Sequence, residues 1–504
     1  MNSVGARISS WLGQPLSALS CVAGWCVATV LFVGVVALLG GPASNDSYET
    51  VFSTWAIQHG QFACAFPVGD RVTAPLYPLA SGGIAALARI GHGVPFPSGA
   101  ALGPDCHRAF LAFNTWSLHA NVQHATIQIG YLSWFALLAG LVAVLRATGR
   151  GRRRWEPAAL ATVACLPPVW LCIEGTFHPE DLMAMGLALA AVALALRSRW
   201  AWAGCVVALA VLSQQFALLV AAPLLVLAPP GRRLAYASWA AGTVVAAIVA
   251  LSAVTSGDAA HAIVFGTGST GGVGGTILWE LDLHGPLLVV CSRIAPVALS
   301  LLVAWWAARH LRAGALEPAA VLSVVALSLG FRLVFEQQLF GYYFMALSVA
   351  LLMLDVVAGR VRATLVGWLA AVSMAYVVGS TAIETLRAPG PAVLNDLLPL
   401  SVMALAVGLF VRDVRRGARA WRTACWAAML AAALVVWKQT DVVGVPPTWL
   451  WQLVLVPPGL VLAATPLLSE VRRRGGAPTH ARPQPAALSA TTGRRGPGGM
   501  VRSP

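Results

Sequence analysis

Long apolar segments separated by short arginine-rich turns constrain the fold of this chain more than any other feature. The first apolar run covers about residues 21–40, and comparable runs recur as far as about residue 468. Roughly 20 consecutive apolar residues are enough to cross the hydrocarbon core of a bilayer as a helix. With 58% hydrophobic and only 10% charged residues, the chain is predicted to be an all-α polytopic membrane protein.

The arginine clusters predict how the segments are oriented. Basic residues concentrate in the cytoplasmic loops of membrane proteins, and four arginines fall within residues 150–154. The other arginine clusters share that side if the chain crosses the membrane twelve times. Both termini are then cytoplasmic, with residues 1–20 as a short start and residues 469–504 as a disordered basic tail. The twelve expected spans lie near residues 21–40, 123–145, 157–173, 182–196, 234–254, 286–307, 316–334, 343–358, 363–380, 396–411, 422–437 and 449–468.

The same pattern explains the net charge of +14 without a nucleic-acid partner, because the basic residues lie in short clusters between apolar runs. The apolar region 201–228 departs from the simple alternation, since arginines flank both of its ends and Ser213, Gln214 and Gln215 interrupt it. We expect a hairpin of two short helices that enters and leaves on the cytoplasmic side. One tilted span is the alternative.

Residues 41–120 form a long first extracytoplasmic loop in this topology, within a multispanning membrane domain that covers residues 21–468. The loop is too long for a simple connection and is expected to contain interfacial helices. Cys64 and Cys106 both fall in it. They could form a disulfide if that face is oxidising, and two free thiols are the alternative. The nine cysteines show no CxxC motif and no zinc-site spacing, so we expect no structural metal site.

Ionisable residues outside the arginine clusters fall mostly in the expected outer turns. Charged groups at membrane depth are costly, so several such turns on one face suggest a shared site. The alternative is structural: the residues near Asp46 and the pair Glu180 and Asp181 would cap helices, and Arg332 and Glu336 would form an i,i+4 ion pair. A metal site from Glu174, His178 and Asp181 is conceivable, but its spacing matches no specific motif. The group comprises Asp46, Glu49, His59, Asp70, His107, His119, His124, Glu174, His178, Glu180, Asp181, Glu280, Asp282, His284, Arg332, Glu336, Gln337, Tyr342 and Tyr343.

Five short motifs in this order carry a family resemblance. They are Asn45-Asp46-Ser47-Tyr48, APLYPL at 74–79, GTFHPED at 175–181, the hairpin region with Gln214, Gln215 and Pro223, and FEQQLFGYY at 335–343. With this organisation, the chain resembles the GT-C class of integral-membrane glycosyltransferases, in particular bacterial enzymes that use polyprenyl-phosphate-mannose. The resemblance implies a bacterial plasma-membrane enzyme whose active face is extracytoplasmic.

The resemblance also implies roles for individual residues. An acidic residue just after the first span is the catalytic base of such enzymes, which points to Asp46, with Glu49 as the alternative. The substrates would be a polyprenyl-phosphate sugar, carrying a mannose-like hexose or a pentose, and an acceptor hydroxyl on a glycan, lipid or protein. Transfer would invert the anomeric centre. No cofactor is certain, and a divalent cation remains open. The expected substrate-binding residues are His59, His178, Glu180, Asp181, Arg332, Glu336, Tyr342 and Tyr343, among which Arg332 would bind phosphate.

Two other function classes compete with the enzyme. A transporter or a flippase for lipid-linked sugars would place charged or broken helices near the bilayer midplane. Here the polar residues gather at one end of the spans, and only residues 213–215 look like a midplane break. This arrangement favours an outward-facing enzyme. In a non-catalytic membrane assembly protein, the third possibility, the acidic residues would serve as caps.

Overall fold

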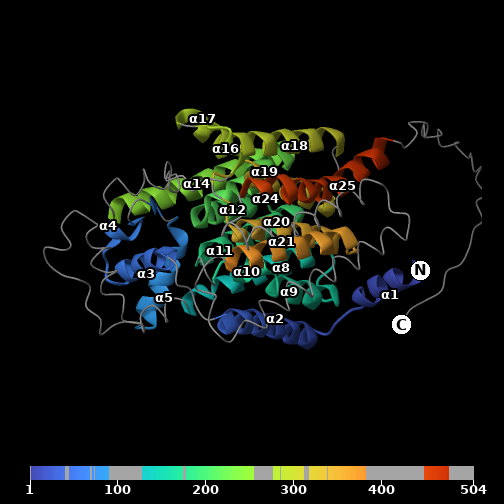
Figure 1. Cartoon of the computed structure of the whole chain (residues 1–504), viewed down its shortest axis with the longest axis horizontal. Coiled ribbons are helices and arrows are strands. Elements are labelled where there is room, and N and C mark those ends of the chain that lie inside the picture. The colour runs from blue at the N-terminus through green and yellow to red at the C-terminus, as the bar shows by residue number, and fades with distance from the viewer. Residues whose placement is uncertain are drawn as a thin grey trace, which may run out of the picture.

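The computed structural model describes residues 2–39, 45–68, 71–72, 74–89, 128–173, 177–254, 276–283, 285–311, 317–337, 339–381 and 448–475. This part of the chain is almost entirely helical (Figure 1). Its strands are β1 (Pro67–Val68) and β2 (Arg71–Val72), an antiparallel pair. The expected all-α class is therefore confirmed, apart from this pair of two-residue strands. Among the described residues, six helices are long and apolar enough to cross a membrane, and further apolar helices are shorter.

The helices follow the expected order of spans. In the first part of the chain they are α1 (Asn2–Leu12), α2 (Ala18–Leu39), α3 (Asn45–Gln58), α4 (Phe62–Ala65), α5 (Leu76–Leu87), α8 (Ser133–Ala147), α9 (Trp155–Ala164), α10 (Pro167–Trp170), α11 (Pro179–Leu196), α12 (Trp200–Ser213), α13 (Leu218–Leu227) and α14 (Pro230–Val254). In the second part they are α16 (Ile277–Glu280), α17 (Gly285–Val289), α18 (Ala295–Leu311), α19 (Pro318–Val334), α20 (Phe344–Val357), α21 (Ala363–Thr381), α24 (Thr448–Val454) and α25 (Val456–Gly475).

Nine of the twelve expected spans fall on these helices, and the spans expected at 396–411 and 422–437 lie outside the described residues. One span differs from the expectation. The segment 157–173 is not a single helix, because α9 ends at Ala164 and Leu166 is extended before Pro167 starts α10. A residue that precedes proline is pushed out of the helical region by the proline ring, which accounts for the break.

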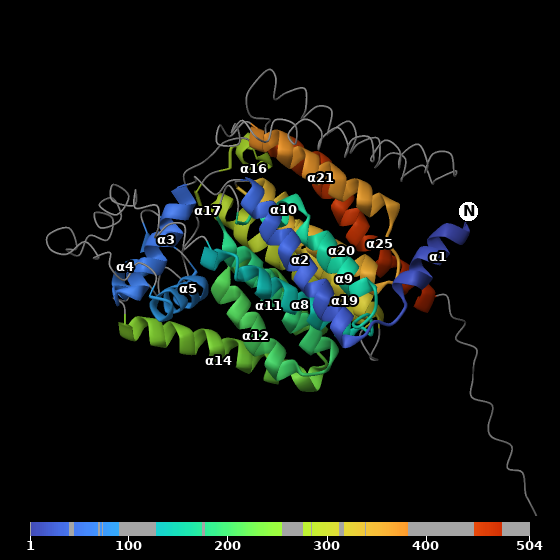
Figure 2. The ribbon, with the colours of Figure 1, turned by 90° about the horizontal axis from the view of Figure 1, so that it is seen from below.

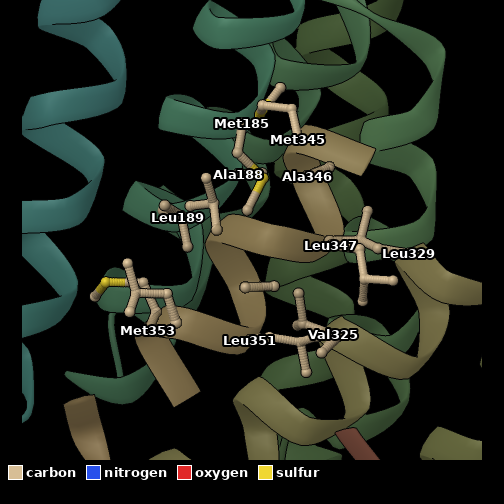
Figure 3. Packing of buried hydrophobic residues seen from close by; sticks show 14 of the residues in the cluster. Met185, Ala188, Leu189, Val325, Leu329, Met345, Ala346, Leu347, Leu351 and Met353 are labelled. Atoms are coloured by element: carbon tan, nitrogen blue, oxygen red, sulfur yellow. The ribbon is translucent and has the colours of Figure 1, made fainter. Parts of the chain in front are cut away.

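Helices α19 and α20 form the centre of the bundle. Every residue from Phe344 to Val356 is buried, and α19 is buried over most of its length. Figure 3 shows side chains of α11, α19 and α20 interdigitating, among them Met185, Leu329 and Leu351. A helix that is buried on all sides lies inside a bundle rather than against lipid. Most of the length of these two helices therefore lies within the protein.

Glycines allow α8 and α11 to approach closely. A Cβ atom at Gly140 would lie 2.1 Å from the carbonyl oxygen of Gly186, and one at Gly186 would lie 2.2 Å from that of Ala136. Small residues let membrane helices pack backbone against backbone, where dispersion contacts are densest. This contact fixes α11, which carries the candidate site at its first turn.

Residues 200–227 form the expected hairpin. Helices α12 and α13 are both shorter than the roughly 20 residues of a full span. Trp200 near the start of α12 packs edge-on against Tyr236 of α14, whose hydroxyl donates to the carbonyl of Ala221 in α13 at 2.9 Å. The start of α12 and the middle of α13 thus lie near the beginning of α14. The tip of the hairpin, at Gln214, is directed into the bundle, beside the start of α11.

The arginine-bearing turns gather at one end of the bundle. The amide of Leu16 donates to the carbonyl of Arg152 at 2.7 Å, and the Arg154 guanidinium stacks on Trp11 at 4.5 Å. Arg150 donates to the carbonyl of Val357 at 3.3 Å. Helix α1 lies at this end of the long axis, and α3, α4 and α5 lie at the other (Figures 1 and 2). The turn at residues 150–154 therefore lies at the end of the bundle opposite α3, α4 and α5.

Candidate functional site

The turn before α11 carries a strained residue and two buried acids. Phe177 has a φ of +52°, a left-handed conformation that costs a non-glycine residue energy and often marks a functional site. His178 precedes Pro179 at the helix start, where the fixed φ of proline is well suited. Glu180 and Asp181 follow and are only 6% and 2% exposed. At the N-terminus of a helix, acidic side chains interact favourably with the helix dipole. A capping role alone, however, would leave these two side chains in solvent.

His178 links this turn to the 3₁₀ turn Gly341–Tyr343, which directly precedes α20. Its Nδ1 lies 2.8 Å from Glu180 Oε1, and its ring stacks on Tyr342 with centroids 4.6 Å apart. Tyr342 in turn packs edge-on against Tyr343 at 4.6 Å. His178 makes no side-chain capping hydrogen bond within the described part of the chain. Its role in the structure is to join an acid to an aromatic platform.

Arg332 brings α19 into the same cluster. Its Nε donates to Glu336 Oε2 at 2.9 Å, which is the i,i+4 ion pair that the sequence predicted as an alternative. The guanidinium also stacks on Tyr343 at 4.4 Å and on Phe216, at the hairpin tip, at 5.2 Å. It lies within electrostatic range of Asp181. Arg332 is therefore not only a helix-end ion pair but the cation at the centre of three converging turns.

The hairpin tip completes the cluster. The side chain of Gln214 interacts electrostatically with Asp181. Even so, Glu180 Oε2 and Asp181 Oδ1 are buried without a hydrogen-bond partner among the described residues. An unsatisfied buried carboxylate oxygen costs about 1–3 kcal/mol or more, so such atoms need an explanation. A ligand that donates hydrogen bonds would supply one.

Helix α3 approaches this cluster through α5. Thr54 Oγ1 lies 2.7 Å from Ser81 Oγ, and Gln58 donates to the carbonyl of Ala85. Because these partners advance together along the chain, α3 and α5 run parallel. The start of α3 therefore lies beside the start of α5, where Tyr77 is within electrostatic range of Glu180.

Asp46 and Glu49 both lie in the first turns of α3, at the end of that helix that is nearest the cluster. Their side-chain contacts lie outside the described residues. His59 lies just beyond the opposite end of α3, about 20 Å of helix away from Asp46. Its Nδ1 contacts the carbonyl of Trp55 at 2.9 Å. The structure thus places Asp46 and His59 at different ends of one helix.

Residues 110–335 match the model of Glycosyltransferase family 87, a family of membrane glycosyltransferases of the GT-C type. The chain is a glycosyltransferase. No curated protein matches it. The matched region of the enzyme contains the turn before α11, the hairpin and Arg332, while α3 precedes it and Glu336, Tyr342 and Tyr343 follow it. The expected GT-C resemblance is confirmed at the level of the family.

The glycosyltransferase has one site-supporting residue that the sequence analysis missed. Gln452 of α24 is 2% exposed. Its Nε2 donates to the carbonyl oxygen of Leu333 at 3.0 Å and lies 3.3 Å from the carbonyl oxygen of Glu336. Its Oε1 accepts a hydrogen bond from the backbone amide of Ile277 at 2.7 Å. These bonds hold the turn that carries Arg332 and Glu336. A single glutamine in an expected span was the available signal, and nothing in the sequence linked it to a turn more than 100 residues away.

Several expected site residues are not part of the cluster. Glu280 and Asp282 are exposed at α16. The described residues contain no group of three potential metal ligands. Cys64 is disulfide-bonded, whereas six other cysteines in the described part of the chain, Cys172 and Cys205 among them, are free thiols. Cys106, its expected partner, lies outside the described residues, as do Asp70, His107, His119, His124, Glu174 and His284.

Proposed function

We propose that this glycosyltransferase transfers a sugar, a mannose-like hexose or a pentose, from a polyprenyl-phosphate donor to an acceptor hydroxyl. The observation that carries the proposal is the buried cluster of Glu180, Asp181 and Arg332 at the end of the bundle opposite the arginine-bearing turns. A donor whose tail stays in lipid presents its phosphate and sugar at such an end. The mixed charges suit a substrate that has both an anionic phosphate and neutral hydroxyls.

The proposed chemistry is a single inverting displacement. Asp46 takes the proton of the acceptor hydroxyl, whose oxygen forms the new bond to the anomeric carbon. The bond from that carbon to the phosphate oxygen breaks, and the polyprenyl phosphate leaves as an anion. Arg332 stabilises the charge that develops on it, because a guanidinium presents two parallel donors to a phosphate. Glu49, one turn along α3 from Asp46, is the alternative base.

The proposed active face is extracytoplasmic. The disulfide at Cys64 lies just after α3, on the side of the bundle that holds α3, α4 and α5. Disulfides persist in oxidising compartments. The arginine-bearing turns at the opposite end fit the positive-inside rule, which favours cytoplasmic termini in a bacterial plasma membrane.

The test is a transfer assay with the full chain in nanodiscs. Purified protein is given polyprenyl-phosphate sugars and a panel of glycan, lipid and protein acceptors. Wild type should transfer sugar, Asp46→Asn should lose transfer while staying folded, and Glu49→Gln should retain most of it. Transfer that survives in Asp46→Asn but fails in Glu49→Gln moves the base to Glu49. Wild type that transfers no sugar from any polyprenyl-phosphate donor contradicts the donor assignment. EDTA in the same assay tests the need for a divalent cation.

A further inference from the structure

Three buried polar atoms along the seam between α5 and α11 make no hydrogen bond to any of the described residues. They are Tyr77 Oη, Glu180 Oε2 and Asp181 Oδ1, and none of them has a hydrogen-bond partner among the described residues. Tyr77 itself is 2% exposed. A folded protein satisfies nearly all of its buried polar groups, so three unsatisfied atoms in one neighbourhood indicate a place for a ligand.

The Tyr77 hydroxyl faces the turn that carries the two acids. A Cβ atom at Gly130 would lie 3.5 Å from Tyr77 Oη and 2.8 Å from the Phe177 ring. Phe177 is the left-handed residue immediately before His178. Tyr77 is also within electrostatic range of Glu180, which in turn is within range of Asp181. Gly130 thus packs directly against the Phe177 ring and lies beside the tyrosine hydroxyl.

The chemistry of these atoms selects one kind of ligand group. Carboxylates accept hydrogen bonds, and a tyrosine hydroxyl both donates and accepts. A phosphate would be repelled by two acids, and its favourable partner is Arg332. Neighbouring hydroxyls on a sugar ring each donate one hydrogen bond and accept others, which matches one phenol and two carboxylate oxygens.

We propose that Tyr77, Glu180 and Asp181 form the subsite that binds the ring hydroxyls of the transferred sugar. Tyr77 is the new member of the site and a determinant of which sugar is accepted. The proposal rests on the function proposed above, since it assumes a sugar donor. It separates the substrate into two parts: the phosphate contacts Arg332, and the sugar ring contacts the α5–α11 seam.

Paired ligands test this division. Binding of a polyprenyl-phosphate sugar and of the same polyprenyl phosphate without sugar is measured for wild type and Tyr77→Phe in nanodiscs. Loss of one hydrogen bond to a charged or polar partner should weaken binding of the sugar-bearing ligand about tenfold. Binding of the sugar-free ligand should stay unchanged. Glu180→Gln should show the same selectivity.

A matched substitution controls for stability. Tyr236 is equally buried, at 2% exposed, but its hydroxyl is satisfied by Ala221 far from the seam. Tyr236→Phe should therefore leave the affinity for both ligands unchanged. Donors that lack single ring hydroxyls refine the test, because the deoxy donor missing the Tyr77 contact should bind wild type and Tyr77→Phe equally.

The outcomes separate the two proposals. Wild type that binds neither ligand contradicts the polyprenyl-phosphate donor. Wild type that binds both, with Tyr77→Phe and Glu180→Gln unaltered or equally weakened for both ligands, contradicts the sugar subsite and leaves the donor assignment standing. In that case a buried water satisfying the three atoms accounts for them.

Discussion

The imidazole of His178 stacks on the phenol ring of Tyr342, with centroids 4.6 Å apart and planes 18° from parallel. The two residues come from turns more than 160 positions apart in the chain. Because His178 also bonds to Glu180, the stack joins the acidic turn of α11 to the start of α20. The site is therefore assembled between helices rather than within one loop.

Two substitutions separate the parts that His178 plays. His178→Phe keeps a ring against Tyr342 but removes the partner of Glu180 Oε1, whereas His178→Gln can keep a donor but loses the stack. We expect His178→Phe to lose more stability, by about 1–3 kcal/mol, because a buried carboxylate is left unpaired. Thermal unfolding in detergent measures this order. The reverse order would show that the stack, rather than the hydrogen bond, holds the turn.

Sugar transfer should depend on the planar shape of the Arg332 guanidinium as well as on its charge. Arg332→Lys keeps the positive charge but replaces the planar guanidinium, which can donate two parallel hydrogen bonds, by an ammonium group. We expect sugar transfer to fall about tenfold in Arg332→Lys and about a hundredfold in Arg332→Gln, the equivalent of one and two charge-assisted hydrogen bonds. The readout is kcat/KM for the donor, with folding checked by thermal unfolding. Arg473→Gln, a 72% exposed arginine at the opposite end, is the control. A lysine variant as active as wild type would count against phosphate binding by Arg332.

Gln452 should stabilise the turn after α19. Gln452→Leu leaves the carbonyls of Leu333 and Glu336 without this donor, so we expect a loss of stability of about 1–3 kcal/mol. Unfolding by heat measures the loss. Leu453→Ala changes the neighbouring side chain, which is 54% exposed, and should cost less. Equal losses in both variants would mean that α24 contributes only packing.

The glycine contact between α8 and α11 should tolerate no methyl group. In Gly186→Ala the new Cβ would lie 2.2 Å from the carbonyl oxygen of Ala136, so the two backbones must separate. We expect a loss of about 1–3 kcal/mol. Gly242→Ala in α14 has open space around it and should be neutral or slightly stabilising. Equilibrium unfolding of both variants in the same detergent gives the comparison, and similar values would disprove a tight contact.

Cysteine labelling checks the proposed orientation. In a background in which the free cysteines are replaced, single cysteines are placed at Gln61, beside α4, and at Ser198, between α11 and α12. Both positions are exposed. A membrane-impermeant maleimide added to intact cells should label Gln61→Cys and spare Ser198→Cys until the cells are opened. Labelling in the opposite order would invert the topology and place the site at the cytoplasm.

Several parts of the site could be predicted from sequence because their signal is local. His178, Pro179 and the two acids at the start of α11 form one short motif, and Arg332 and Glu336 have the spacing of a helical ion pair. Tyr77 and Gln452 gave no such signal. A tyrosine or glutamine in an apolar helix is ordinary until its neighbours are known, and both residues act across helix contacts.

The sequence by itself determined the order of most helices, the hairpin at 201–228 and the placement of the arginine clusters in turns between apolar segments. Each of these depends on the composition of one segment and its cost in lipid. Only the tertiary structure decided that Tyr77, Asp181, Arg332 and Tyr342 meet. Transmembrane helices are apolar on nearly every face, so their sequences do not specify which neighbours they pack against. Close backbone contacts such as that of Gly140 with Gly186 decide it.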